Sequence, residues 1–214
     1  MLEKFKSHCQ QQAAQIPQER LSLLASLAEN MVEMQENGNL HLLWIDTHNS
    51  RRSIFCQVWA KCWAMHHGLK GFKMYSGGTK VEAIHTNTLD ALNNAGLFVN
   101  RLDARENAHY QLYYQEGEAP VAVFSKLLED APNPKDHFLG IYTSATAKER
   151  VPAISGARLT FSLLYPDPKS ADGSLEEEGV YAELNEQVAV EMGVLFGMVA
   201  GKVGLTDGTT NFTN

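Results

Sequence analysis

Short apolar runs alternate along the chain with longer stretches of helical spacing, a pattern typical of an α/β protein. Buried strands are expected at the apolar start of the stretch 41–53 and over residues 71–75, 137–143 and 159–164, which are mostly apolar. Helices are expected over 54–68, from Thr86 or Asn87 to Asn94, after the third strand at 144–150, and over 174–203. Strands that alternate with helices predict a doubly wound, Rossmann-like parallel sheet of four strands.

The first 38 residues depart from this alternation and predict a helical hairpin. Helices are expected over 2–15 and 18–36, divided at Ile16-Pro17 and ended by Asn37-Gly38. The second helix carries one apolar stripe, which needs a partner. The stripe either packs on the rest of the chain or forms a surface for dimerisation or for another partner. We therefore divide the chain into a helical extension over 1–38, an α/β domain over 39–206 and a frayed tail over 207–214.

Residues 97–127 lack helical spacing and interrupt the alternation. Three segments of strand-like residues are separated by turn residues, which predicts a small β insertion: a hairpin or edge strands added to the sheet. The last helix is expected to begin at Ser174, which with Glu177 has the spacing of a capping box.

The stretch 46–53 joins the first strand to its helix by a tight polar loop. Backbone amides of such a loop, the first turn of the helix and the guanidinium of Arg52 together favour an oxyanion such as phosphate. The alternative is a solvated turn with two surface arginines. The residues expected to contact the anion are Thr47, His48, Asn49, Ser50, Arg51, Arg52 and Ser53.

Composition narrows the range of partners. The chain has 214 residues, 44% of them hydrophobic, which suffices for one core, and a net charge of -7 that argues against nucleic acid and anionic membranes. Its N-terminal residues lack the apolar core of a signal peptide, so a cytoplasmic protein is expected. The three cysteines and eight histidines show no metal-binding spacing, and we expect no metal and no cofactor.

The run D-T-H-N-S-R-R-S, residues 46–53, resembles the phosphate loop of the low-molecular-weight protein tyrosine phosphatases and the related arsenate reductases. Those loops have a Cys, five residues, an Arg and then Ser or Thr. Asn49, Ser50, Arg52 and Ser53 match this pattern, whereas the nucleophilic Cys of the family is replaced by Asp46.

The resemblance extends over about residues 40–205 and implies further roles. Ser76 corresponds to a serine that hydrogen-bonds the loop Asn, and Asp167, before Pro168, corresponds to the general acid. Arsenate reductases carry two relay cysteines, where this chain has Ser144 and Val151, so arsenate reduction is not expected.

The predicted catalytic residues are thus Asp46, Arg52 and Asp167. We expect a phosphatase-like protein that is weakened or inactive, a pseudophosphatase, and that binds phosphate, a phosphorylated protein or a small phosphomonoester. One alternative is an active phosphomonoesterase with Asp46 as its nucleophile, or an engineered form of an active phosphatase in which Asp46 replaces the Cys. Another is a partner-binding protein that uses the N-terminal helices, with a homodimer as one form.

Overall fold

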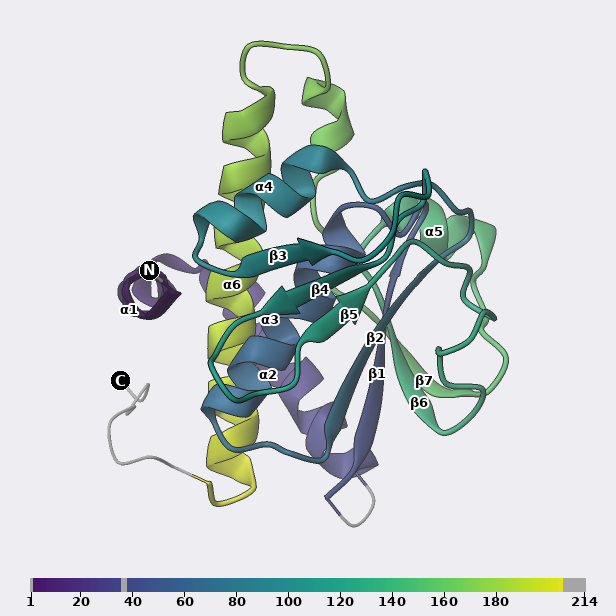
Figure 1. Ribbon diagram of the computed structural model, residues 1–214. Helices are drawn as coiled ribbons and strands as arrows, with labels where there is room; N and C mark the ends of the chain where they lie inside the picture. Colours follow the sequence, from purple (N-terminus) through teal and green to yellow (C-terminus); the bar gives the residue numbers. More distant parts are fainter. Residues whose placement is uncertain (1, 36–37, 206–214) are drawn as a thin grey trace.

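A computed structural model describes residues 2–35 and 38–205 (Figure 1). Its main sheet has four parallel strands, as predicted, and their order in the sheet is β2-β1-β6-β7. The strands are β1 (Leu40–Asp46), β2 (Phe72–Gly78), β6 (Phe138–Tyr142) and β7 (Ala157–Ser162). The carboxyl ends of parallel strands meet at one edge, so β1 delivers Asp46 to the edge where ligands of such sheets bind.

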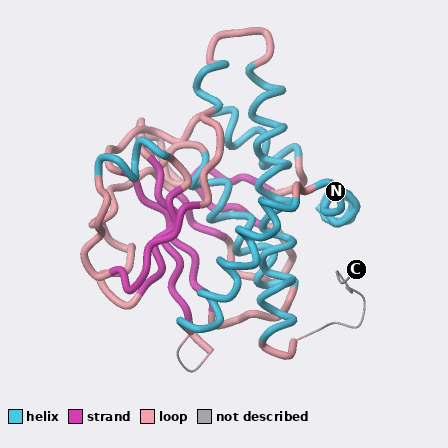
Figure 2. Tube along the Cα trace, turned by 180° about the vertical axis from the view of Figure 1, so that it is seen from behind, coloured by secondary structure: helices cyan, strands magenta, loops and turns pink. Residues whose placement is uncertain are grey.

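Helices cover the two faces of this sheet unequally. Leu42 and Trp44 of β1 belong to the large core on the side of the long helices, whereas Leu43 and Ile45 face a smaller core that includes Ala147. Figure 2 shows the long helices grouped on one side of the strands. The helices that follow β1 in the chain are α3 (Arg52–His66), α4 (Thr86–Asn94), α5 (Ala145–Arg150) and α6 (Glu177–Lys202), with a short 3-10 helix at Pro168–Ala171.

The N-terminal helices pack on the rest of the chain. They are α1 (Leu2–Gln12), a 3-10 turn (Ala13–Gln15) and α2 (Gln18–Met34). Both α1 and α2 contact α6, and Leu24, Leu27, Ala28 and Met31 of α2 are fully buried. The predicted stripe therefore covers α6, the first of the two alternatives for it. Glu36, the expected end of the second helix, lies outside the described residues.

The β insertion forms with the antiparallel pairing of a hairpin, whereas the alternative of edge strands added to the main sheet is wrong. A separate antiparallel sheet contains β3 (Phe98–Arg101), β4 (Tyr110–Tyr113) and β5 (Val121–Val123). Beyond β5 the chain meets the end of β2, where Gly78 bridges to Leu127. Earlier along both strands, the side-chain amide of Gln57 donates to Met74 O of β2 at 3.4 Å and to Ala122 O of β5 at 3.2 Å. Gln57 thus lies between the facing edges of β2 and β5 and bonds to the backbone of both.

Two boundaries also differ from the sequence-based expectation. The fourth strand begins at Ala157 and ends at Ser162, before the predicted end. The last helix begins at Glu177, and the capping box is wrong, because Ser174 Oγ accepts from Glu176 N while a Glu177 carboxylate oxygen accepts from Gly173 N. None of the helices in the described part of the chain has the length and apolar character needed to cross a membrane.

Candidate oxyanion-binding site

The loop between β1 and α3 is short and packed tightly against the end of β2. Asn49 adopts a positive φ of 49°, which Asn tolerates better than most residues. A Cβ at Gly78 would lie 2.5 Å from Lys80 O and 2.9 Å from Asn49 N. Only glycine therefore allows the two segments to approach this closely.

The side chain of Asn49 fixes the loop at its centre. Its Nδ2 donates to Ser53 Oγ at 2.9 Å, and its Oδ1 accepts from Lys126 N at 3.1 Å. The bond from Ser76 that the resemblance implied is absent from the described residues. Ser76 Oγ instead donates to Gln57 Oε1 at 2.6 Å, because the insertion brings Lys126 to Asn49 in its place.

The carbonyl oxygens of the loop bond to segments outside it. Three hydrogen bonds are of this kind: Lys80 N donates to Thr47 O at 2.8 Å, Ser125 Oγ donates to His48 O at 2.8 Å, and His85 N donates to Ser50 O at 3.2 Å. The hydroxyl of Ser50 donates to Ala83 O at 2.6 Å, and that of Thr47 lies 3.1 Å from Ser144 Oγ. These bonds fix the orientation of the peptide planes.

The amides of the same loop are left free. Across residues 2–35 and 38–205, no acceptor pairs with the backbone amides of residues 48–53. Arg51, at the N-cap of α3, makes no capping bond with its side chain. Consecutive free amides next to a helix N-terminus create a local positive potential.

Arg52 joins the two predicted catalytic carboxylates. Its Nη2 lies 2.8 Å from Asp46 Oδ1 and 2.8 Å from Asp167 Oδ2. Asp46 is 3% exposed, whereas the side chain of Asp167 is 45% exposed. The buried Arg52 Nε has no acceptor in the described part of the chain. The structure thus brings Asp167 to Asp46 and Arg52, which lie at the two ends of the 46–53 loop region.

Arg51 and His48 direct their side chains to other acids. Arg51 donates to the hydroxyl of Tyr181 at 2.5 Å and to Asp172 Oδ2 at 2.7 Å. His48 Nε2 lies 3.6 Å from a carboxylate oxygen of Glu82. Like Arg52, which contacts Asp167, these two residues have their side chains engaged with acidic partners outside the loop.

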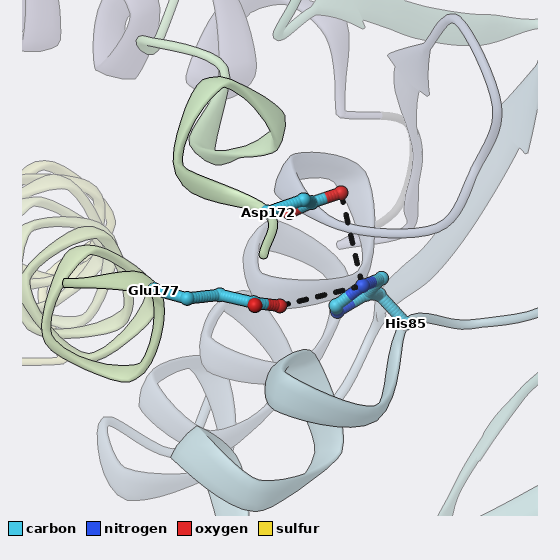
Figure 3. Close-up of side chains that lie close together, drawn as sticks. All are labelled: His85, Asp172 and Glu177. Atoms are coloured by element: carbon cyan, nitrogen blue, oxygen red, sulfur yellow. Dashed lines mark ion pairs between the residues drawn. The ribbon is translucent and has the colours of Figure 1, made fainter. Parts of the chain in front are cut away.

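Sequence reasoning missed a cluster beside the loop, formed by His85, Asp172 and Glu177 (Figure 3). His85 Nε2 lies 3.8 Å from each carboxylate, and three potential ligand atoms lie within 4.8 Å of one another. Burial, followed by the charge of Arg51, lowers the pKa of His85. Because Asp172 already pairs with Arg51, a metal ion here would have to compete with that guanidinium. Of the three residues, Asp172 contacts Arg51 directly, with its Oδ2 at 2.7 Å from the guanidinium.

All three cysteines are buried. Burial raises the pKa of Cys56 well above the ordinary value and that of Cys9 and Cys62 to about 12. Ser144, at one of the two places implied for relay cysteines, caps α5 by accepting from Ala147 N at 3.3 Å. Cys9, Cys56 and Cys62 therefore remain protonated thiols at neutral pH.

No family model and no curated protein sequence matches this chain. Solved structures match it in fold. A serine-for-cysteine mutant of the YwlE arginine phosphatase, with its active-site serine phosphorylated, has a TM-score of 0.52 at 13% identity, covering 78% of this chain and 100% of its own. A YwlE mutant from Bacillus subtilis has a TM-score of 0.51 at 13% identity, covering 78% and 99%. The low-molecular-weight protein tyrosine phosphatase from T. tengcongensis has a TM-score of 0.50 at 14% identity, covering 73% and 97%. The chain therefore has the fold of the low-molecular-weight protein tyrosine phosphatases.

Proposed function

We propose that the 46–53 loop binds the phosphate group of a phosphorylated protein or a small phosphomonoester, and that the chain lacks thiol-based phosphatase activity. The observation that carries this proposal is the set of unpaired donors: the amides of 48–53 and the buried Nε of Arg52. Buried donors without acceptors are costly, and a bound oxyanion would satisfy them. The likeness in fold to the YwlE arginine phosphatase and to a tyrosine phosphatase supports a phosphorylated ligand.

The same site carries charges that oppose such a ligand. Asp46 and Asp167 both contact Arg52, so these three side chains together have one more negative charge than positive. An incoming dianion would be attracted by the loop amides and repelled by the two carboxylates. We therefore expect phosphate to bind, but more weakly than in a loop whose arginine is free.

The absence of a thiolate at position 46 removes the covalent route of the phosphatases. A low-pKa thiolate attacks phosphorus readily, whereas a carboxylate is the weaker nucleophile. Asp46 Oδ1 already accepts from Thr47 N at 2.7 Å and from Arg52. These bonds stabilise the carboxylate as a fixed anion and reduce its nucleophilicity.

One observation supports a second candidate function. Asp46 Oδ2, unlike Oδ1, accepts no hydrogen bond from the described residues. In an active phosphomonoesterase this oxygen would attack phosphorus, the bond from phosphorus to the leaving oxygen would break, and Asp167 would protonate the leaving group. Hydroxylamine would then trap an acyl phosphate on Asp46 during turnover of p-nitrophenyl phosphate.

Calorimetric titration with inorganic phosphate and with vanadate tests the binding proposal. The parent should bind both, and Arg52→Ala should weaken binding by at least about tenfold, the loss expected for a charged hydrogen-bond partner. Arg101→Ala, an exposed arginine of β3, makes the same charge change away from the loop and should leave the affinity unchanged. Thermal melts establish that each variant is folded. A folded parent without affinity for either anion would overturn the proposal.

A further inference from the structure

A cavity of about 410 Å³ lies between the facing edges of β2 and β5. Figure 1 shows β5 beside β2. The two segments meet where Gly78 bridges to Leu127, and the side chain of Gln57 bonds to both strands. The walls include the apolar side chains of Phe72, Met74 and Phe124. The volume is in the range of pockets that take small organic ligands, roughly 300 to 1,000 Å³.

Four lysines line this cavity: Lys61, Lys70, Lys73 and Lys126. No Asp or Glu is among its lining residues, and none of the four lysines forms an ion pair with the described residues. The whole chain has a net charge of -7. Four cations without an ion-pair partner in the described part of the chain surround one cavity, a local reversal of the protein's charge that raises the local concentration of anions.

Lys126 is the most buried of the four, with 3% of its surface exposed. Its ammonium lies 3.5 Å from Ser76 Oγ, 3.4 Å from Phe124 O and 4.7 Å from the centre of the Phe124 ring. Burial lowers the pKa of Lys126 to about 8, although the charge of Asp130 acts in the opposite direction. Neutral partners at these distances compensate a buried ammonium poorly, so an anionic ligand would lower its energy.

We propose that this cavity, which we call the lysine cavity, binds a small organic polyanion with an apolar or aromatic body and several phosphate or carboxylate groups. The lysines bind the anionic groups, and the apolar walls contact the body. The side chain of Gln57 limits the space between the strands, which favours a small molecule over a peptide strand. No residue of 46–53 lines the cavity, so this site is separate from the loop.

Calorimetric titration of the full chain with ATP, in the absence of divalent cations, tests this proposal. Citrate offers carboxylates in place of phosphates, and adenosine offers the aromatic body without charge. We expect ATP or citrate to bind and adenosine to bind at least about tenfold more weakly, because each well-placed ion pair contributes on the order of 1 kcal/mol or more. The anion that binds tighter identifies the preferred acidic group.

Substitutions locate the binding. The double variant Lys70→Gln and Lys73→Gln should weaken binding of the polyanion at least tenfold, and Lys126→Met should do the same by a separate change. Lys4→Gln, on the exposed face of α1, is the matched control and should have no effect. Arg52→Ala separates this site from the loop and should leave the binding intact.

Three results would overturn the proposal. The first is that neither ATP nor citrate binds. The second is that Lys4→Gln weakens binding as much as the cavity variants, which would indicate a general charge effect. The third is that Arg52→Ala abolishes binding while the cavity variants retain it, which would place the ligand in the loop and would leave the proposed function of the loop standing.

Discussion

The 46–53 loop and the lysine cavity differ in what balances their cations. In the loop, Arg52 contacts two carboxylates at 2.8 Å, and Arg51 contacts Asp172 at 2.7 Å. In the cavity, the four lysines have no carboxylate within ion-pair distance among the described residues. The two sites lie close in the fold, since Lys126 N bonds to Asn49 of the loop while its side chain lines the cavity.

This difference affects both stability and binding. Pairing offsets part of the cost of burying an arginine, but an anion must compete with the carboxylates that already contact it. The buried Lys126, which has no ion-pair partner among the described residues, destabilises the folded chain and is free to bind an anion. The number of cations alone therefore does not identify the better anion site in this protein. Whether each cation already contacts a carboxylate affects anion binding as much.

The largest expected effect comes from Asp46→Cys. The parent should hydrolyse p-nitrophenyl phosphate slowly, and this change should raise the rate at least about a thousandfold, because it supplies a thiolate nucleophile and removes one carboxylate from Arg52. Steady-state assays with both proteins measure the gain. Adding Arg52→Ala to this variant should abolish it. A folded Asp46→Cys protein that neither hydrolyses the substrate nor binds vanadate would show that the loop serves structure alone.

The next effect concerns stability and the unpaired lysine. The folded-state pKa of Lys126, about 8, lies below its ordinary value of 10.5, so the unfolded state binds more protons between these pH values. Stability contributed by this group therefore rises with pH across the window from about 8 to 10.5, and at pH 7 the charged lysine is a net cost. Lys126→Met should be more stable than the parent at pH 7 by roughly 2 to 3 kcal/mol, and the advantage should vanish near the upper end of the window.

Urea unfolding at several pH values measures this difference. Lys4→Met, on the exposed surface of α1, makes the same change in charge and is the control. Parallel stability curves for the parent and Lys126→Met between pH 7 and 10.5 would contradict the interpretation that Lys126 is buried without adequate compensation.

The main sheet and the core of the loop site were predictable from the sequence. Apolar runs mark β1 and β6, whose residues are buried on both faces, and the polar break after β1 marks the loop. Asp46 and Asp167 follow separate strands of a parallel sheet, so their meeting at Arg52 follows from the topology. These features depend on local patterns and on one general rule of strand direction.

The remaining features depend on contacts between distant segments. The insertion forms a sheet of its own, and the side chain of Gln57, from α3, bonds to the backbone of both β2 and β5. The lysines of the cavity come from α3, from the segment around β2 and from the chain after β5, so no spacing in the sequence connects them. The same holds for His85, which meets Asp172 and Glu177 only through the packing of α4 on α6.

The most direct test of the account is the affinity of inorganic phosphate for the parent and for Asp46→Asn, measured by calorimetry at pH 7. The change removes one carboxylate from Arg52 and keeps an oxygen that can accept from Thr47 N. Asp90→Asn, on the exposed surface of α4, is the control for net charge. If the carboxylate competes with the ligand, Asp46→Asn should bind phosphate about tenfold more tightly than the parent and the control. Equal or weaker binding by a folded Asp46→Asn protein would contradict the claim that the loop's own carboxylate opposes the oxyanion.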